Sequence, residues 1–116
     1  MALTVVDHPL AGTMLTALRD ASTPPPLFRL LTKRLSLVLA VEATRGVPTA
    51  SRPVTTPLAE TQGTAFAAPL VAVPILRAGL GMADTAHGML PESQMGFVGL
   101  ARNEETFQPE AYMASL

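Results

Sequence analysis

Apolar residues gather in two short runs in the second half of the chain. The runs are Pro69–Leu76 and Met95–Leu100, and each has the length of a buried strand, although the periodicity of the first run also fits a buried helix segment. Between them, apolar or half-apolar residues recur at helical spacing, namely Leu80, Ala83, His87 and Leu90. A strand, a helix and a strand of these lengths predict a βαβ unit whose two strands are parallel neighbours.

The beginning of the chain has the periodicity of a helix. Pro9–Ala21 is predicted to be a helix that packs through one apolar face, formed by Leu10, Met14, Leu15 and Leu18. The short apolar segment before it, Leu3–Val6, is predicted to be an edge strand or an extended arm.

A second, longer helix is predicted to run to about Thr44. Its start signal is Ser22–Pro26, because serine or threonine can cap a helix and proline fits the first turn. The apolar stripe of this helix consists of Phe28, Leu31, Leu35 and Val38. Leu37–Val41 is apolar on every side, which predicts a buried C-terminal end inside the core, with a subunit contact as the alternative.

The segment between the helices and the βαβ unit has a different composition. Arg45–Gly63 is rich in Pro, Thr, Ser and Gly, and residues 46–68 are predicted to be an irregular or hairpin segment, with weak strand signals at Val54–Thr55. The sequence shows no internal repeat and no second domain. It therefore predicts one α/β domain, with a helical segment over about 1–45, the irregular segment over 46–68 and the βαβ unit over 69–102.

Composition and charge narrow the class of protein. The 116 residues are 48% hydrophobic with a mean hydropathy of +0.34, which argues against a disordered chain. The net charge is −1 and no basic stripe is present, which argues against a nucleic-acid partner. The chain has no cysteine, so it has neither disulfides nor a thiolate metal site.

Targeting and membrane-spanning segments bear on the cellular compartment of the protein. No signal peptide is visible, and the longest uncharged stretch is Thr61–Leu76. This stretch is shorter than the roughly 20 residues that span a membrane. We therefore expect a soluble cytoplasmic protein without a membrane partner.

Two arginines, Arg77 and Arg102, follow the two predicted strands. In an open parallel sheet, ligands bind outside the carboxyl ends of the strands, so we expect both guanidiniums on one rim. The glycine-bearing turn Gly79–Gly81 lies between them and offers backbone N–H groups at a helix start, where anions bind. Guanidinium groups pair with phosphate oxygens. The pattern predicts a phosphate or pyrophosphate site, with two unrelated surface cations as the alternative.

Other polar residues give weaker signals. Glu104 and Glu105 follow Arg102 and suggest either a Mg²⁺ site or a salt bridge that orients the arginine, and the salt bridge requires less. His8 has no partnered carboxylate nearby, so we interpret it as structural. The sequence identifies no catalytic residue and no set of metal ligands.

Two longer segments together resemble uracil phosphoribosyltransferases, namely Pro74–Met82 and, after it, Gly99–Thr106 with Pro109. Shorter segments resemble the family in the same order along nearly the whole chain, namely His8–Leu10, Phe28–Arg29 and Glu42–Thr44. Ala101 departs from the family pattern, because many members have tyrosine at this position.

The resemblance implies a fold and a reaction. The fold would be the N-terminal part of a phosphoribosyltransferase-type parallel sheet with flanking helices. The reaction would join uracil to 5-phosphoribosyl 1-diphosphate and give UMP and diphosphate, a step of pyrimidine salvage. Arg77 and Arg102 would contact the diphosphate, with help from the N–H groups of Ala78 and Gly79, and Mg²⁺ would accompany this substrate. The resemblance also implies a homo-oligomer in the complete protein and GTP as an effector.

Two parts of the family have no counterpart in this sequence. One is an acidic strand end followed by a Thr-Gly-Gly-Ser-like loop for the ribose 5-phosphate, and the other is the uracil-binding segment. We therefore expect roughly the first half of the enzyme, inactive alone and either marginally stable or self-associating, because part of the cover of a parallel sheet is missing. The alternative is an inert remnant that retains a diphosphate-binding rim and a subunit contact. A regulatory RNA-binding relative fits the balanced charge least.

Overall fold

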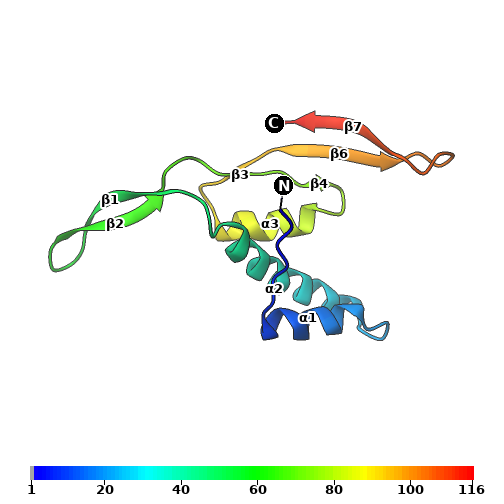
Figure 1. Ribbon diagram of the computed structural model, residues 1–116, viewed down its shortest axis with the longest axis horizontal. Helices are drawn as coiled ribbons and strands as arrows, with labels where there is room; N and C mark the ends of the chain where they lie inside the picture. Colours follow the sequence, from blue (N-terminus) through cyan, green and yellow to red (C-terminus); the bar gives the residue numbers. More distant parts are fainter. Residues whose placement is uncertain (1) are drawn as a thin grey trace.

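Residues 2–116, which the computed structural model describes, form three helices and seven strands (Figure 1). The helices are α1 (Pro9–Arg19), α2 (Pro25–Ala43) and α3 (Leu80–Met89). The strands are β1 (Thr49–Thr55), β2 (Glu60–Phe66), β3 (Val71–Ala72), β4 (Ile75–Leu76), β5 (Gln94–Met95), β6 (Phe97–Arg102) and β7 (Pro109–Ser115). Residues 2–8 form an arm without strand pairing.

The two apolar runs form one parallel ladder. β3 pairs with β5 and β4 pairs with β6 in the same register, and α3 connects the two runs. The Gly96 N–H donates to the Ala72 carbonyl (3.0 Å), and the Val98 N–H donates to the Pro74 carbonyl (3.1 Å). Pro74 has no N–H and removes one ladder bond, which separates β3 from β4. The predicted βαβ unit with parallel neighbouring strands is confirmed.

A further strand, β7, lies on the other side of β6 and runs antiparallel to it. The register of this pair shifts between Gly99 and Leu100. The composition of Phe107–Tyr112 predicts only an extended segment interrupted by Pro109, whereas the structure has a seven-residue strand that begins at this proline. Proline is tolerated there because it is the first residue of a strand.

The connection between β6 and β7 contains one residue in the left-handed region, Phe107, with a φ of 58°. Its side chain is 69% exposed, so it contributes little to the core. A left-handed conformation costs a residue with a Cβ roughly 1–2 kcal/mol, and glycine avoids this cost.

Phe107→Gly is therefore expected to raise the free energy of unfolding by about 1 kcal/mol, measured by urea titration at low protein concentration. Ala111→Gly in β7 is the matched control, because Ala111 does not have a positive φ and glycine should destabilise the strand there. An equal loss of stability in both variants would contradict the assignment of strain to Phe107.

The three helices lie on one side of the strands (Figure 1). α3 packs on β3, α2 packs on α3, and α1 packs on α2. Within residues 2–116 no helix covers the other face of β3 and β4, where Val71, Val73 and Ile75 are exposed by 55%, 43% and 55%. Parallel sheets are normally covered by helices on both faces, so the exposure of this bare face, formed by Val71, Val73 and Ile75, is unusual.

The buried face of α1 differs from the predicted one. Ala11 and Met14 are buried, whereas Leu10 and Leu15 are exposed. α1 packs against α2, and this single contact buries a narrower stripe than the predicted face. The helix also ends at Arg19, two residues before its predicted end.

The prediction that the C-terminal end of α2 is buried is wrong. Leu37 and Val41 are exposed, and the three residues between them are only half-buried. In the N-terminal half of the helix, Leu31 is buried as expected but Phe28 is exposed. α2 is covered by α1 and α3 over only part of its circumference, so residues that are apolar on every side do not all find a partner. Neither α2 nor any other helix within residues 2–116 is long and apolar enough to cross a membrane.

The starts of α1 and α2 are capped in different ways. The His8 Nδ1 accepts a hydrogen bond from the Leu10 N–H (3.0 Å) at the start of α1, which agrees with a structural role for this histidine. The N-cap of α2 is Pro24 and has no side-chain cap, so the predicted serine or threonine cap is wrong. The Thr23 hydroxyl instead donates to the Ala17 carbonyl and ties α2 to the end of α1.

The segment predicted as irregular or hairpin contains a regular hairpin. β1 and β2 pair antiparallel through seven residues each, from Thr49 opposite Phe66 to Thr55 opposite Glu60. Figure 1 shows this hairpin extending away from the helices. Every residue of β1 is exposed.

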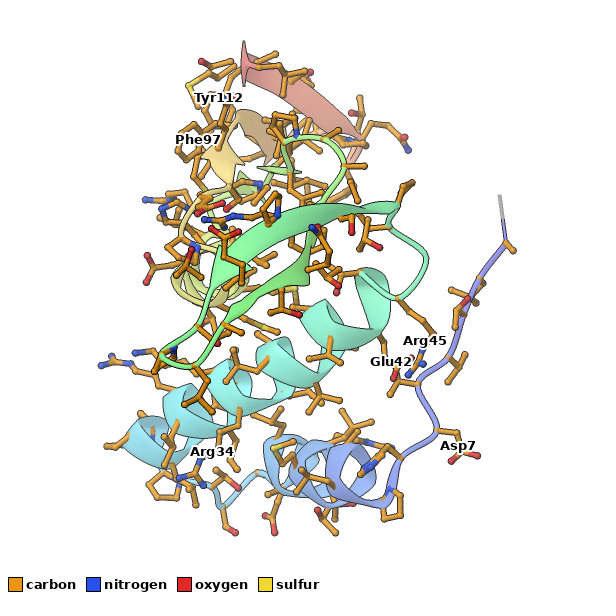
Figure 2. The ribbon with its side chains drawn as sticks, turned by 90° about the vertical axis from the view of Figure 1, so that its left-hand side faces the viewer. Asp7, Arg34, Glu42, Arg45, Phe97 and Tyr112 are labelled. Atoms are coloured by element: carbon orange, nitrogen blue, oxygen red, sulfur yellow. The ribbon has the colours of Figure 1, made fainter. Side chains whose placement is uncertain are left out.

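Ionisable groups at the ends of α1 and α2 are held by local contacts. Glu42 and Arg45 form the one ion pair within residues 2–116, with 2.7 Å between Oε1 and Nη2, and the N-terminal arm passes near it (Figure 2). The Arg45 guanidinium lowers the pKa of Glu42, and the same hydrogen bond raises the pKa of Arg45. Hydrogen bonds from Ser22 lower the pKa of Asp20.

Candidate functional site

Both arginines predicted for the anion site lie at the carboxyl edge of the parallel ladder. Arg77 directly follows the last residue of β4, and Arg102 is the last residue of β6. The peptide bond between Leu76 and Arg77 is cis. Because Leu76 pairs with Gly99, Arg102 lies further along its strand than Arg77 does. The structure brings the two arginines to one edge, at different positions along the strands.

Arg77 lines an open pocket of about 670 Å³ at this edge. The other lining residues are Ala78, Leu100, Ala101 and Tyr112. Arg102 is not among them. The pocket therefore combines one cation with a backbone turn, two apolar side chains and one phenol.

Backbone hydrogen bonds hold the turn from β4 to α3. The Gly79 N–H donates to the Ile75 carbonyl (2.9 Å), and the Leu80 N–H donates to the Arg77 carbonyl (3.1 Å). A Cβ on Gly79 would lie 2.9 Å from the Ile75 carbonyl oxygen, so the close approach requires glycine. The Gly79 N–H predicted to face an anion is thus already engaged. The Ala78 N–H has no partner within residues 2–116 and is available to a ligand.

The electrostatics of this edge favour an anion. The ion pair of Glu42 with Arg45 is the only one formed within residues 2–116, so no carboxylate compensates the charge of Arg77. α3 begins beside this arginine, with Gly79 as its N-cap. The first N–H groups of a helix have no partner inside the helix, and the aligned peptide dipoles make its start positive.

Glu104 and Glu105 do not pair with Arg102, so the predicted salt bridge is wrong. Asn103 organises this turn instead. Its Oδ1 accepts two backbone N–H groups of the turn, including that of Glu105 (2.9 Å), and its Nδ2 donates to Glu110 (2.8 Å). The side chains of Glu104 and Glu105 remain exposed on the turn.

Residues 2–116 contain no group of three or more His, Cys, Asp or Glu side chains that could hold a metal ion. Mg²⁺ in phosphate-binding proteins commonly keeps several waters and is bound by one or two carboxylates together with the phosphates of the substrate. The lining of the Arg77 pocket contains no carboxylate, so these residues neither supply the protein ligands of such an arrangement nor form a cage that binds the metal alone.

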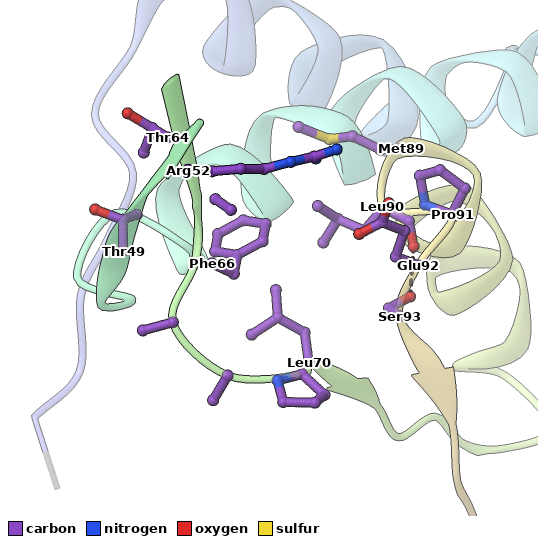
Figure 3. Close-up of a pocket in the computed structure, with 14 residues that line it drawn as sticks. Thr49, Arg52, Thr64, Phe66, Leu70, Met89, Leu90, Pro91, Glu92 and Ser93 are labelled. Atoms are coloured by element: carbon purple, nitrogen blue, oxygen red, sulfur yellow. Dashed lines mark hydrogen bonds between the residues drawn. The ribbon is translucent and has the colours of Figure 1, made fainter. Parts of the chain in front are cut away.

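A second open pocket, of about 680 Å³, lies at the opposite end of the parallel ladder (Figure 3). The hairpin supplies Arg52 and Phe66, the segment before β3 supplies Leu70, and the end of α3 supplies Met89 and Leu90. Figure 3 shows the Arg52 side chain extended above Phe66 toward Met89. This lining is mainly apolar, so the pocket does not have the chemistry of an anion site.

Tyr112 is the residue of the Arg77 pocket that sequence reasoning did not assign. It lies on β7 opposite the register shift in β6, and such a shift leaves no mark in the alternation of residues. The available signal is Gly99 in β6, because a glycine inside a strand often marks a close approach of another group.

Comparison with known proteins gives consistent matches. A family model described as uracil phosphoribosyltransferase matches residues 5–116. Proteins named uracil phosphoribosyltransferase from Corynebacterium diphtheriae and Paenarthrobacter aurescens are 47% and 49% identical to the whole chain, which spans 55% and 56% of their lengths. The solved structure of the AQ2163 protein from Aquifex aeolicus matches with a TM-score of 0.87 and 30% identity, over 97% of this chain and 55% of that one. The chain thus spans about half the length of these relatives.

Proposed function

The chain belongs to the uracil phosphoribosyltransferase family, and we propose that its carboxyl edge binds the diphosphate group of 5-phosphoribosyl 1-diphosphate. In the proposed reaction of the complete enzyme, uracil reacts with this substrate and gives UMP and diphosphate, a step of pyrimidine salvage. The observation that carries the proposal is Arg77, a guanidinium without a carboxylate partner in an open pocket. The free N–H of Ala78 and the start of α3 lie beside it.

The proposed mechanism follows from where charge develops. A ring nitrogen of uracil attacks the anomeric carbon and loses its proton to water or to a base outside these 116 residues, while the bond from this carbon to the diphosphate oxygen breaks. Negative charge grows on the leaving group, so fixed cations and N–H donors stabilise the transition state more than the ground state. Arg77 would supply the first cation, Ala78 a donor, and Arg102 a second cation from the same edge. Mg²⁺ is proposed from the family relationship alone to accompany the diphosphate, and no residue of the Arg77 pocket is assigned to hold it.

Other features of the complete protein are proposed from the family relationship. They are a cytoplasmic location, a homo-oligomeric assembly and GTP as an effector, with uracil and 5-phosphoribosyl 1-diphosphate as the small-molecule partners. Neither a nucleic acid nor a membrane is proposed as a partner.

For the 116 residues alone we propose diphosphate binding without turnover. The lining of the Arg77 pocket contains no carboxylate and no imidazole that would accept a proton from uracil. The chain also spans only about half the length of the relatives named uracil phosphoribosyltransferase. Binding and turnover are therefore tested separately.

The test is a chimera that joins residues 1–116 to the segment that follows the matched part of the Corynebacterium diphtheriae relative. Formation of UMP from uracil and 5-phosphoribosyl 1-diphosphate is expected for the chimera and not for the 116 residues alone, with the intact relative as the positive control. A folded chimera that makes no UMP would overturn the proposed reaction. Turnover by the 116 residues alone would overturn the division between binding and turnover.

A further inference from the structure

Tyr112 enters the Arg77 pocket because of an irregularity in the β6–β7 pair. Gly99 pairs with Met113 and Leu100 pairs with Ala111, so Tyr112 is an extra residue without a partner on β6. A residue of this kind forms a β-bulge, which redirects a side chain that regular pairing would place elsewhere. Here the redirected side chain lines the same pocket as Arg77.

Gly99 provides the space in which the phenol ring lies. A Cβ at this position would lie 2.5 Å from Cε2 and 2.6 Å from Cζ of Tyr112, so any other residue would force the ring to move. Gly99 itself is buried, whereas the tyrosine is 58% exposed. The ring thus rests on the glycine and keeps an accessible side toward the pocket.

The polar end of this ring is free. The side-chain hydrogen bonds around the β6–β7 turn involve Asn103, Thr106 and Glu110 and not the Tyr112 hydroxyl, and a phenol can donate to an anionic oxygen. Ala101, which also lines the pocket, has only a methyl group and takes up little of its space. The pocket therefore has one charged donor directly after β4 and one neutral donor on β7.

We propose that Tyr112 is a ligand-contacting residue of the diphosphate site, whose hydroxyl donates to a phosphate oxygen opposite Arg77. This inference rests on the proposed function, because it assigns a second donor to the same diphosphate. It also gives the bulge in β7 and the glycine in β6 one common role, which is to position the phenol.

The composition of the chain makes this proposal directly measurable. Tyr112 is the single tyrosine and the chain has no tryptophan, so intrinsic fluorescence reports on this ring alone. Titration of the full 116-residue chain with inorganic pyrophosphate and Mg²⁺ is expected to change tyrosine emission along the same binding curve that calorimetry gives. A tyrosine with a purely structural role would keep its emission as the pocket fills.

Three variants separate the contributions to pyrophosphate affinity, with circular dichroism as the check of folding. Tyr112→Phe removes only the hydroxyl and is expected to weaken binding roughly tenfold, as for the loss of one hydrogen bond to a charged group. Gly99→Ala displaces the ring and is expected to weaken binding by a similar factor. Met113→Leu, the neighbouring residue in β7, is the matched control and should bind as the natural chain does.

The outcomes also separate this proposal from the function on which it rests. If Arg77→Ala abolishes binding while Tyr112→Phe binds as tightly as the natural chain with unchanged emission, the role of Tyr112 is overturned and the diphosphate site stands. If Arg77→Ala binds as tightly as the natural chain, the diphosphate site itself fails. Absence of pyrophosphate binding by the folded natural chain at millimolar concentration would overturn both.

Discussion

Arg77→Ala is expected to weaken pyrophosphate binding by the 116-residue chain by about 10- to 150-fold. Hydrogen bonds to charged groups contribute roughly 1.5–3 kcal/mol, and each 1.4 kcal/mol corresponds to a factor of ten. Arg77 is the only cation that lines its pocket, so no neighbouring cation in the lining can replace it. In the chimera with the Corynebacterium diphtheriae segment, the same substitution is expected to lower kcat/KM for 5-phosphoribosyl 1-diphosphate by a similar factor.

The controls for this prediction use the other arginines of the chain. Arg52→Ala removes an equal charge from the hairpin, at the opposite end of the parallel ladder, and should leave pyrophosphate affinity unchanged. Arg77→Lys keeps the charge but loses the planar fork, so an intermediate affinity is expected. Equal affinities for Arg77→Ala and Arg52→Ala would show that net charge, rather than the pocket, attracts the anion.

The second large effect concerns the bare face of β3 and β4. The isolated 116-residue chain is expected to self-associate, so that light scattering gives a mass above 12.2 kDa that increases with concentration. The accessible surface is 9218 Å², compared with about 6,000 Å² for a compact monomer of this mass. The radius of gyration is 18.1 Å, compared with about 13 Å for a compact domain of this length.

The backbone of β3 and β4 indicates which edge a second copy of the chain would contact. In a parallel strand, alternate residues direct both backbone groups to the same neighbour. The carbonyls of Ala72 and Pro74 face β5 and β6, so the backbone groups of Val71 and Val73 face the open edge. The backbone groups of Pro74 face β6, so the N–H that proline lacks is not missing from the open edge. The open edge therefore keeps its donors and can pair with a further strand.

Val73→Lys places a charge on this edge and is expected to shift the chain toward the monomer, because lysine on an edge strand opposes further pairing. Val5→Lys in the N-terminal arm is the matched control, since Val5 is an exposed valine away from the sheet. A natural chain that is a single monomeric species with a cooperative thermal transition would contradict the prediction. An equal effect of both lysines would assign the association to general surface hydrophobicity.

The sequence predicted the parts of the fold that depend on residues close together in the chain. The βαβ unit was predictable because an apolar run, a glycine turn and a helical stripe follow one another within Pro69–Leu100. The position of Arg77 and Arg102 followed from that unit alone, since parallel strands end at the same edge. Their common role in diphosphate binding stays a prediction.

The errors in the sequence analysis arose where the outcome depends on a partner that the pattern does not specify. The apolar end of α2 predicted burial, but the cover from α1 and α3 leaves Leu37 and Val41 exposed. The salt bridge from Arg102 to Glu104 or Glu105 was the simplest pairing of neighbouring charges. Asn103 fixes the turn in another way, because its amide side chain bonds both to the turn backbone and to the next strand.

The pocket around Arg77 also has a consequence for how the chain folds. All of its lining residues lie between Arg77 and Tyr112, on elements joined by one ten-residue helix and one short turn. Contacts between residues close in sequence need little loop-closure entropy and form quickly. The Arg77 pocket can therefore form during folding from one continuous segment, before α1, α2 and the β1–β2 hairpin have packed.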